Sequence, residues 1–323
     1  MERNYSIDIA KAIAILLMIL GHCPGIPYLL RNTIFSFHMP LFFIFSGYFY
    51  KERALKDTIN SGLKHLVFPY LITSIFIIVL CISAQEPDLA KDKIVGSIMS
   101  NGGWPHEIIG RNLPYIGPIW FLLALFWCKI FYACLKRITN KCLLVSFLIS
   151  TTSFVIGKYI LNLPFGILTG FCGLIFYSMG DYWHTRLNNQ PINAYLLAIG
   201  VVIWAFCIWK SHLELATFEC KHYPLNMIAA FVGTYVTYLV SQKMPSFIIP
   251  TMCWIGSNTL LVLCYHSLTQ YILLNVSLYV LTPMGIAIST PGRWLLNFGL
   301  GLVLPAIHVL LLSYIRSFKG TQQ

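Results

Sequence analysis

Charged residues are scarce in this chain of 323 residues: Asp, Glu, Lys and Arg together make up 10% of it, and only 11 residues are acidic. A soluble domain of this length carries about a quarter charged residues, because water must solvate its surface. With 57% hydrophobic residues instead, this chain has too few polar groups to cover a water-exposed surface. The composition excludes an ordinary soluble globular protein and predicts that lipid is the main solvent.

Three further features are lacking. The first apolar segment contains Asp8 and Lys11 and has no small-residue cleavage site, so we expect no removable signal peptide. The 10 cysteines lie mostly inside apolar segments without paired metal-ligand spacing, so we interpret them as small buried residues and expect no metal site. The net charge of +11 is spread over many loops, without a basic block, so we expect no nucleic-acid partner.

What the chain does contain is a series of apolar segments, each long enough to cross a bilayer. A spanning helix needs about 20 mainly apolar residues, and helices satisfy their own backbone hydrogen bonds in hydrocarbon. We find no internal repeat and no second domain, so we predict a single membrane-embedded, all-α domain over residues 1–323. Its helices, about ten in number, are expected at residues 7–23, 33–50, 66–84, 117–135, 142–157, 165–180, 192–209, 225–240, 257–281 and 295–315.

The distribution of lysine and arginine orients this bundle. An even number of spans places both termini on one side, and the loops richer in basic residues are cytoplasmic. With cytoplasmic termini, the inner segments hold twelve Lys and Arg and the outer segments hold eight. We therefore predict both termini in the cytoplasm and an extracytoplasmic loop at residues 85–116. Its Trp104, His106 and Glu107 fit a carbohydrate acceptor, and a solvated connector is the alternative.

The first predicted helix carries three polar side chains, Asp8, Lys11 and His22. A charged group inside a membrane helix costs about 2.5–3.5 kcal/mol on insertion scales, so such groups are candidates for function. Lys11 and His22 are separated by about 20° of net rotation and about 16 Å along the axis, and Asp8 lies within about 40° of His22. The structural alternative is an interfacial ion pair and a histidine at the helix end. It accounts for each residue singly but not for their shared face.

Later segments add further candidates. His38 falls near the outer end of the second predicted helix, at the level of His22, and Ser46 and Gly47 are small residues that allow close approach of a backbone or a thin ligand. Trp120, at the outer start of the fourth predicted helix, is suited either to stacking on a sugar ring or to the interfacial aromatic belt. His266 lies about halfway along the ninth, as a site residue or as an interhelical hydrogen-bonding residue.

Five short motifs follow one another along nearly the whole chain: Lys11 with ten residues before His22, Phe42-Phe43-Ile44-Phe45-Ser46-Gly47-Tyr48, Lys64-His65-Leu66-Val67-Phe68-Pro69-Tyr70, Pro118-Ile119-Trp120-Phe121-Leu122, and Gly256-Ser257-Asn258-Thr259-Leu260 followed by Tyr265-His266. In this order they resemble motifs of the membrane acyltransferase-3 family. The sequence at 37–43 is similar to its branch of polysaccharide O-acetyltransferases and fucose 4-O-acetylase-like proteins. Lys11 stands where many members have Arg, and the stretch before Pro69 is less arginine-rich than usual.

The resemblance implies a membrane-bound O-acyltransferase. It would take an acetyl or similar acyl group from cytosolic acyl-CoA, with acetyl-CoA as donor substrate and no permanently bound cofactor. The acceptor would be a hydroxyl of an extracytoplasmic sugar, polysaccharide or lipid-linked glycan. The implied catalytic residues are His22 as base, His38 and Asp8; the donor-binding residues are Lys11, Ser46, Gly47 and Lys64; the acceptor-binding residues are Trp120 and His266.

A secondary transporter or flippase for a lipid-linked glycan or small acid is the alternative from another class, since it also needs polar groups inside the membrane. The absence of two-half symmetry and the concentration of polar groups in the first two helices favour the enzyme. We expect a multi-pass protein of a bacterial cytoplasmic membrane.

Overall fold

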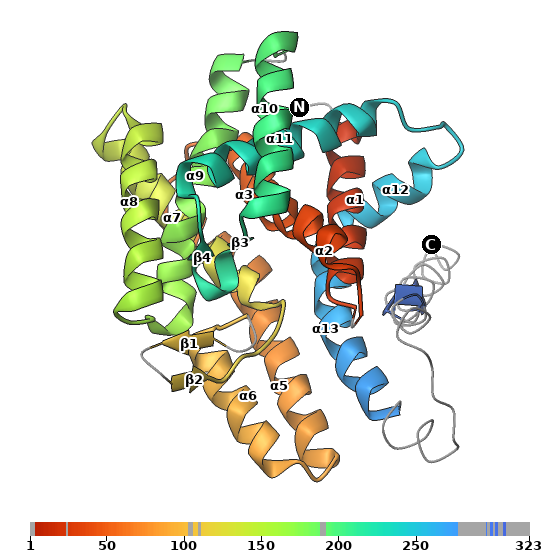
Figure 1. Ribbon diagram of the computed structural model, residues 1–323. Helices are drawn as coiled ribbons and strands as arrows, with labels where there is room; N and C mark the ends of the chain where they lie inside the picture. Colours follow the sequence, from red (N-terminus) through yellow and green to blue (C-terminus); the bar gives the residue numbers. More distant parts are fainter. Residues whose placement is uncertain are drawn as a thin grey trace, which may run out of the picture.

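The computed structural model describes residues 4–23, 25–102, 106–108, 111–187 and 192–276, with a few positions between 295 and 307. Helices make up nearly all of the described chain, and the strands form two short antiparallel hairpins (Figure 1). The helices are α1 Tyr5–Gly21, α2 Tyr28–Phe35, α3 His38–Tyr48, α4 Leu55–Gly62, α5 Phe68–Ser83, α6 Pro87–Met99, α7 Trp120–Ile138, α8 Cys142–Tyr159, α9 Ile167–Tyr182, α10 Ala194–Lys210, α11 Tyr223–Gln242, α12 Ile249–Ser257 and α13 Thr259–Val276; the strands are β1 His106–Ile108, β2 Arg111–Leu113, β3 Leu213–Glu214 and β4 Glu219–Cys220.

Several of these helices have the length and the apolar surface expected of membrane-spanning helices. Among the described residues, the segments Leu55–Ser83, α8 and α11 are long and apolar enough to cross a membrane, by length and composition. On α5 the exposed side chains are large and apolar and recur every three or four residues, so one whole face of this helix is apolar. Those residues are Phe68, Leu71, Ile72, Ile75, Phe76, Val79 and Ile82. The prediction of an all-α membrane bundle is confirmed; the cytoplasmic location of the termini stays a prediction.

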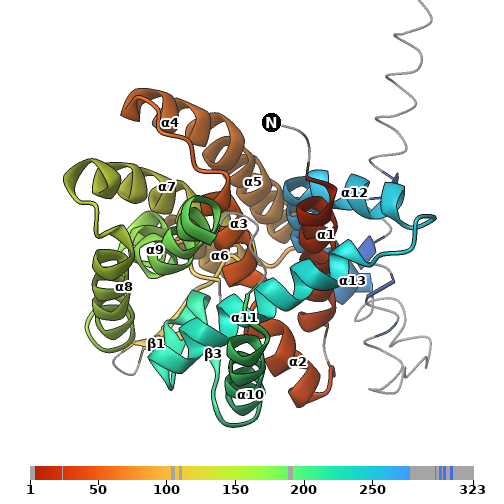
Figure 2. The same ribbon diagram turned by 90° about the horizontal axis from the view of Figure 1, so that it is seen from above.

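Helix α3 lies at the centre of the bundle, in contact with α1, α9 and α11 (Figure 2). Two glycines set its distance from α9. A Cβ atom on Gly47 of α3 would collide with the carbonyl oxygen of Tyr177, and one on Gly180 of α9 would collide with that of Ile44. The two backbones therefore touch in both directions, as small residues allow in membrane helix pairs.

The N-terminal half of α1 is fixed by the junction between α12 and α13. A Cβ on Gly256 would collide with the carbonyl oxygen of Asp8, so α12 and α1 are also in backbone contact. Thr259 and Leu260 begin α13 immediately afterwards. The Gly-Ser-Asn-Thr sequence thus connects two helices directly beside the charged end of α1.

Three of the predicted elements differ from the observed ones. The predicted helix 33–50 is interrupted between α2 and α3, because Pro40 lacks the N–H that would bond Ser36 and its ring excludes a continuous helix there. The predicted loop 85–116 contains α6 and the β1–β2 hairpin, which pairs His106 with Leu113. Helix α12 was missed, since the predicted segment began at residue 257, and so was α4, which lies between the predicted helices 33–50 and 66–84.

Two predictions fall on parts of the chain that are not described. Most of the predicted helix 295–315 lies outside the described residues, and so does Trp104 in the loop 85–116. The extracytoplasmic side of that loop and the single-domain organisation over residues 1–323 stay predictions.

Candidate functional site

The charged end of α1 opens into a cavity of about 260 Å³. Lys11 lies on its wall, and the Lys11 Nζ atom is 2.8 Å from Asp8 Oδ1. The Asp8 side chain is 13% exposed and that of Lys11 24%, so this ion pair is largely shielded from solvent. An ammonium group has three donors and Asp8 accepts from one of them, so Lys11 can also donate to a ligand in the cavity.

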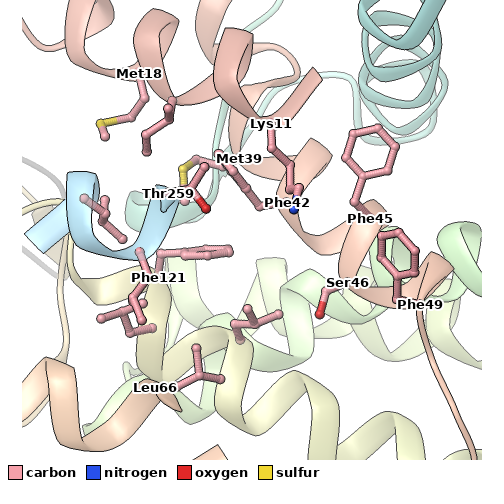
Figure 3. A pocket seen from close by; sticks show the side chains of 15 residues that line it. Lys11, Met18, Met39, Phe42, Phe45, Ser46, Phe49, Leu66, Phe121 and Thr259 are labelled. Carbon is pink, nitrogen blue, oxygen red and sulfur yellow. The ribbon is translucent and has the colours of Figure 1, made fainter. Parts of the chain in front are cut away.

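The rest of this cavity is almost entirely apolar. Figure 3 shows Lys11 and Met18 on one wall, with Phe121 and Leu66 opposite and Ser46 below Lys11. The lining residues are Lys11, Ile15 and Met18 of α1, Met39, Phe42, Phe45, Ser46 and Phe49 of the α3 region, Leu66, Phe121, Leu122 and Leu125, and Thr259, Leu260 and Leu263 of α13. A narrow apolar cavity with a cation at one end suits an uncharged chain attached to an anionic group.

His22 caps the C-terminal end of α1, one turn beyond the last α1 residue of this cavity. Its Nδ1 atom lies 2.8 Å from the carbonyl oxygen of Met18. A carbonyl oxygen only accepts, so Nδ1 carries the proton and Nε2 keeps its lone pair in the neutral ring. The same arrangement recurs at His38, whose Nδ1 is 2.8 Å from the carbonyl oxygen of Ile34. Each imidazole is therefore held by the carbonyl oxygen four residues earlier, His22 by α1 and His38 by α2, with Nε2 as the basic atom.

The imidazole of His22 lies close to those of His38 and His266. Its ring centroid is 6.4 Å from that of His38 and 6.0 Å from that of His266. His38 is 2% and His266 1% exposed, and no described residue hydrogen-bonds His38 Nε2 or either ring nitrogen of His266. Buried polar atoms without partners are uncommon in native proteins and mark functional sites.

A second, smaller cavity lies on the far side of Met39. Its volume is about 20 Å³, enough for about one water molecule. Its lining consists of His22, Phe35, His38, Met39, Gly102, Pro118, Trp120, Leu213, Glu214, Leu215 and Ala216. Met39 is the residue common to the two cavities, so its side chain separates the apolar cavity from the histidines.

Glu214 is the acidic residue of this small cavity, and the sequence analysis did not identify it. His212 donates from Nε2 to Glu214 Oε2 at 3.2 Å, and the Arg31 guanidinium is 3.9 Å from the same oxygen. Burial alone raises the pKa of Glu214, but the hydrogen bond from His212 and the charge of Arg31 lower it by more. The pKa therefore lies below its ordinary value, and Glu214 is an anion at neutral pH.

Among the described residues, one cluster of His and Glu side chains around Glu214 has the spacing to hold a metal cation. His212, Glu214 and Glu219 offer ligand atoms within 4.8 Å of one another. Arg31 already lies against Glu214, and the hydrogen bond from His212 satisfies one of its oxygens. The internal pairing accounts for this cluster without an ion.

The structure brings some of the predicted site residues together and separates others. His22, His38 and Trp120 line the small cavity, with His266 adjacent, and Lys11 and Ser46 line the apolar cavity. Gly47 faces the backbone of α9 instead. Lys64 lies in the π-helical turn Leu63–Val67, is exposed and does not line the cavity. Asp8 contacts Lys11, about 21 Å along the helix axis from His22.

Comparisons with known proteins cover most of the chain. A family model described as an acyltransferase domain matches residues 4–312. The nodulation protein NolL of Mesorhizobium japonicum is 24% identical over 231 residues, which are 68% of this chain and 56% of that protein. The chain thus aligns with little more than half the length of this relative. No solved structure matches.

Proposed function

The chain belongs to the acyltransferase 3 family, and from this membership we propose that it is a membrane-bound O-acyltransferase. The enzyme would move an acetyl group, or a similar acyl group, from cytosolic acyl-CoA to a hydroxyl of an extracytoplasmic sugar or polysaccharide. Membership itself makes the chain an acyltransferase. The single observation that carries the finer proposal is the pair of cavities on either side of Met39, with Lys11 at one end and His22 at the other.

The donor side of the proposal rests on the apolar cavity. Lys11 compensates an anionic group of acyl-CoA at the mouth, and the uncharged thioester arm lies along Ile15 and Met18 towards His22. Lys11 and His22 are about 16 Å apart along α1, a distance that an extended arm spans easily. Ser46 and Thr259 are polar lining residues in addition to Lys11, and Ser46 is suited to hydrogen-bond the arm. Lys64, being exposed nearby, would act on the donor only outside the cavity.

The chemical step follows from the orientation of His22. The acceptor hydroxyl attacks the thioester carbonyl carbon while His22 Nε2 takes its proton. The tetrahedral intermediate then collapses: the C–S bond breaks, the ester C–O bond is complete, and the departing thiolate takes the proton from His22. His38 presents a second basic nitrogen to the same cavity and would accept a hydrogen bond from another hydroxyl of the acceptor, which orients the reacting one. Trp120 lines the same cavity and would contact the acceptor hydroxyls, and His266, whose ring centroid is 6.0 Å from that of His22, would position His22.

The remaining residues have supporting roles in this proposal. Asp8 keeps Lys11 in place through the ion pair, and Gly47 keeps α3 close to α9, so that both walls of the donor cavity are fixed. The proposed location is a bacterial cytoplasmic membrane, with both termini in the cytosol and the small cavity facing outwards.

The test uses purified full-length protein in detergent with radiolabelled acetyl-CoA and a panel of methyl glycosides of fucose, rhamnose, galactose and glucose. We expect label in a glycoside ester with wild type and at least a 100-fold lower rate with His22→Ala. His65→Ala is the matched control, because His65 is exposed and, within the described part of the chain, hydrogen-bonds the carbonyl of Ser61 alone. Vesicle uptake of an unmodified glycoside without label transfer would instead identify a transporter.

A further inference from the structure

We propose that Glu214 is an acceptor-binding residue that selects polyhydroxylated acceptors, by accepting a hydrogen bond from the hydroxyl next to the one that is acylated. This inference rests on the proposed function and specifies the acceptor half of that site. Glu214 comes from the short hairpin β3–β4, far in sequence from the helices that carry the histidines. It shares the small cavity with His22 and His38.

Glu214 is held rigidly by residues of two elements. His212 donates to its Oε2, and the other ring nitrogen of His212 lies 3.2 Å from Asn32 Oδ1. Asn32 is 3% exposed and donates from Nδ2 to the carbonyl of Ile208. This chain of contacts fixes the carboxylate between α2 and the end of α10, as a preorganised binding group requires.

One carboxylate oxygen stays available for a ligand. Both His212 and Arg31 contact Oε2, and no described residue hydrogen-bonds Glu214 Oε1. The side chain is 17% exposed and lies at the cavity lining. A carboxylate only accepts hydrogen bonds, so its natural ligand there is a hydroxyl or amine N–H, and its negative charge strengthens that bond.

The opposite wall independently points to a ligand. His38 Nε2 is buried without a hydrogen-bond partner among the described residues, although His38 is only 2% exposed. It lines the same cavity as Glu214. An unsatisfied basic nitrogen there calls for a hydroxyl or amine donor from outside the protein, the same kind of ligand that Glu214 requires.

The size of the cavity decides which part of the acceptor enters. About 20 Å³ is too small for a sugar ring, so only the hydroxyl groups at the edge of the acceptor enter. The ring therefore stays at the mouth, where the Arg31 guanidinium lies over the Phe35 ring at 4.2 Å from its centroid. A hydroxyl on the neighbouring carbon then reaches Glu214 while the reacting hydroxyl reaches His22. The acceptor class is a diol with neighbouring hydroxyls, and a monohydric alcohol is a poor acceptor.

The experiment compares wild type, Glu214→Gln and Glu219→Gln with radiolabelled acetyl-CoA, the best methyl glycoside of the panel above and its singly deoxygenated analogues. Glu219 is the matched control because it lies on the same hairpin and also lies near His212 Nε2, at 3.9 Å, but is 52% exposed and does not line the cavity. With wild type, loss of one hydroxyl other than the acylated one should lower kcat/KM about 10- to 100-fold. Glu214→Gln should lower kcat/KM for the intact glycoside by a similar factor, mainly through KM. This variant should then acylate the intact glycoside and that deoxygenated analogue with similar kcat/KM.

Each outcome decides a separate point. If wild type transfers label to no glycoside, the proposed function and the subsite both fail. If it transfers label but Glu214→Gln keeps the wild-type KM and the wild-type preference among analogues, the subsite alone is wrong. Acetyl-CoA binding to Glu214→Gln, measured without acceptor, shows whether the variant is folded; if it is not, Glu214→Asp takes its place, and an unchanged acceptor KM in that variant overturns the subsite.

Discussion

At the scale of single residues, the small cavity and its surroundings contain buried polar atoms that destabilise the fold. His38 Nε2 and both ring nitrogens of His266 are buried without partners among the described residues. Each such atom costs about 1–3 kcal/mol of desolvation that folding does not recover. A fold selected for stability alone would place leucine or phenylalanine there. The imidazoles are therefore best explained by what they bind.

His38→Leu tests this explanation by separating stability from activity. Replacing the imidazole removes an unsatisfied nitrogen, at the cost of the hydrogen bond to Ile34, so we expect the unfolding temperature in detergent to stay the same or rise. Acyl transfer should fall at least tenfold, because the hydroxyl loses its orienting partner. Thermal unfolding and label transfer are measured on one preparation. A large fall in the unfolding temperature would mean that His38 is structural.

Lys93 gives a prediction about pH. This side chain of α6 is 7% exposed, donates to the carbonyl of Tyr115 at 3.0 Å and lies 3.8 Å from the centroid of the Tyr115 ring. Burial lowers its pKa from 10.5 to about 8. Above about pH 8 the unfolded chain therefore binds more protons than the folded one, so stability rises with pH in that range.

The expected gain is about 2 kcal/mol between about pH 8 and about pH 9.5, since one pKa unit corresponds to about 1.4 kcal/mol. Denaturant unfolding of wild type and Lys93→Met at these two pH values measures it. The methionine variant should lose the rise, because it has no ammonium group to discharge. Lys91→Met is the control: Lys91 lies on the same helix and its side chain is 75% exposed. Equal pH dependence in wild type and Lys93→Met would contradict the prediction.

At the scale of elements, the sequence was sufficient to predict that Lys11 and His22 share one face of α1. It was not sufficient to predict which residues line the cavities opposite that face. A regular helix fixes the angle between Lys11 and His22 from their spacing alone. Glu214 reaches His22 only because the hairpin after α10 folds back beside α2, a tertiary contact without a local signal. The break before α3 did have a signal in Pro40, which the apolar pattern of residues 33–50 concealed.

The contact between α3 and α9 yields the element-scale prediction. Gly47→Ala and Gly180→Ala each insert a methyl group against a carbonyl oxygen of the other helix, so the helices must separate. We expect each to lower the free energy of unfolding by about 1–3 kcal/mol and to weaken acetyl-CoA binding, since α3 forms one wall of the donor cavity. Gly299→Ala is the control, because an added Cβ there meets no described atom within 4 Å. Unchanged stability in both α3–α9 variants would refute the close contact.

At the scale of the whole molecule, the two cavities impose a direction on the reaction. One is apolar with Lys11 at its end, the other polar with Glu214, and Met39 lies between them with 9% exposure. Methionine is flexible and adapts to irregular space, so in the proposed reaction a small acyl group would pass its side chain while bulk water is kept from the thioester. The donor and the acceptor would then be bound from opposite ends of α1.

Met39→Trp should close this passage. The indole is larger and stiffer than the thioether, so we expect acetyl-CoA binding to change less than threefold while transfer to the glycoside falls at least 100-fold, because the thioester no longer reaches His22. Met39→Leu, similar in volume, is the control and should keep most of the activity. Sealed vesicles give the second measurement: label should reach a glycoside trapped inside only when acetyl-CoA is supplied outside to protein whose Lys11 end faces out. If transfer proceeds equally well when donor and acceptor are supplied on the same side of the membrane, the two substrates share an entrance. The division at Met39 would then have no role in the reaction.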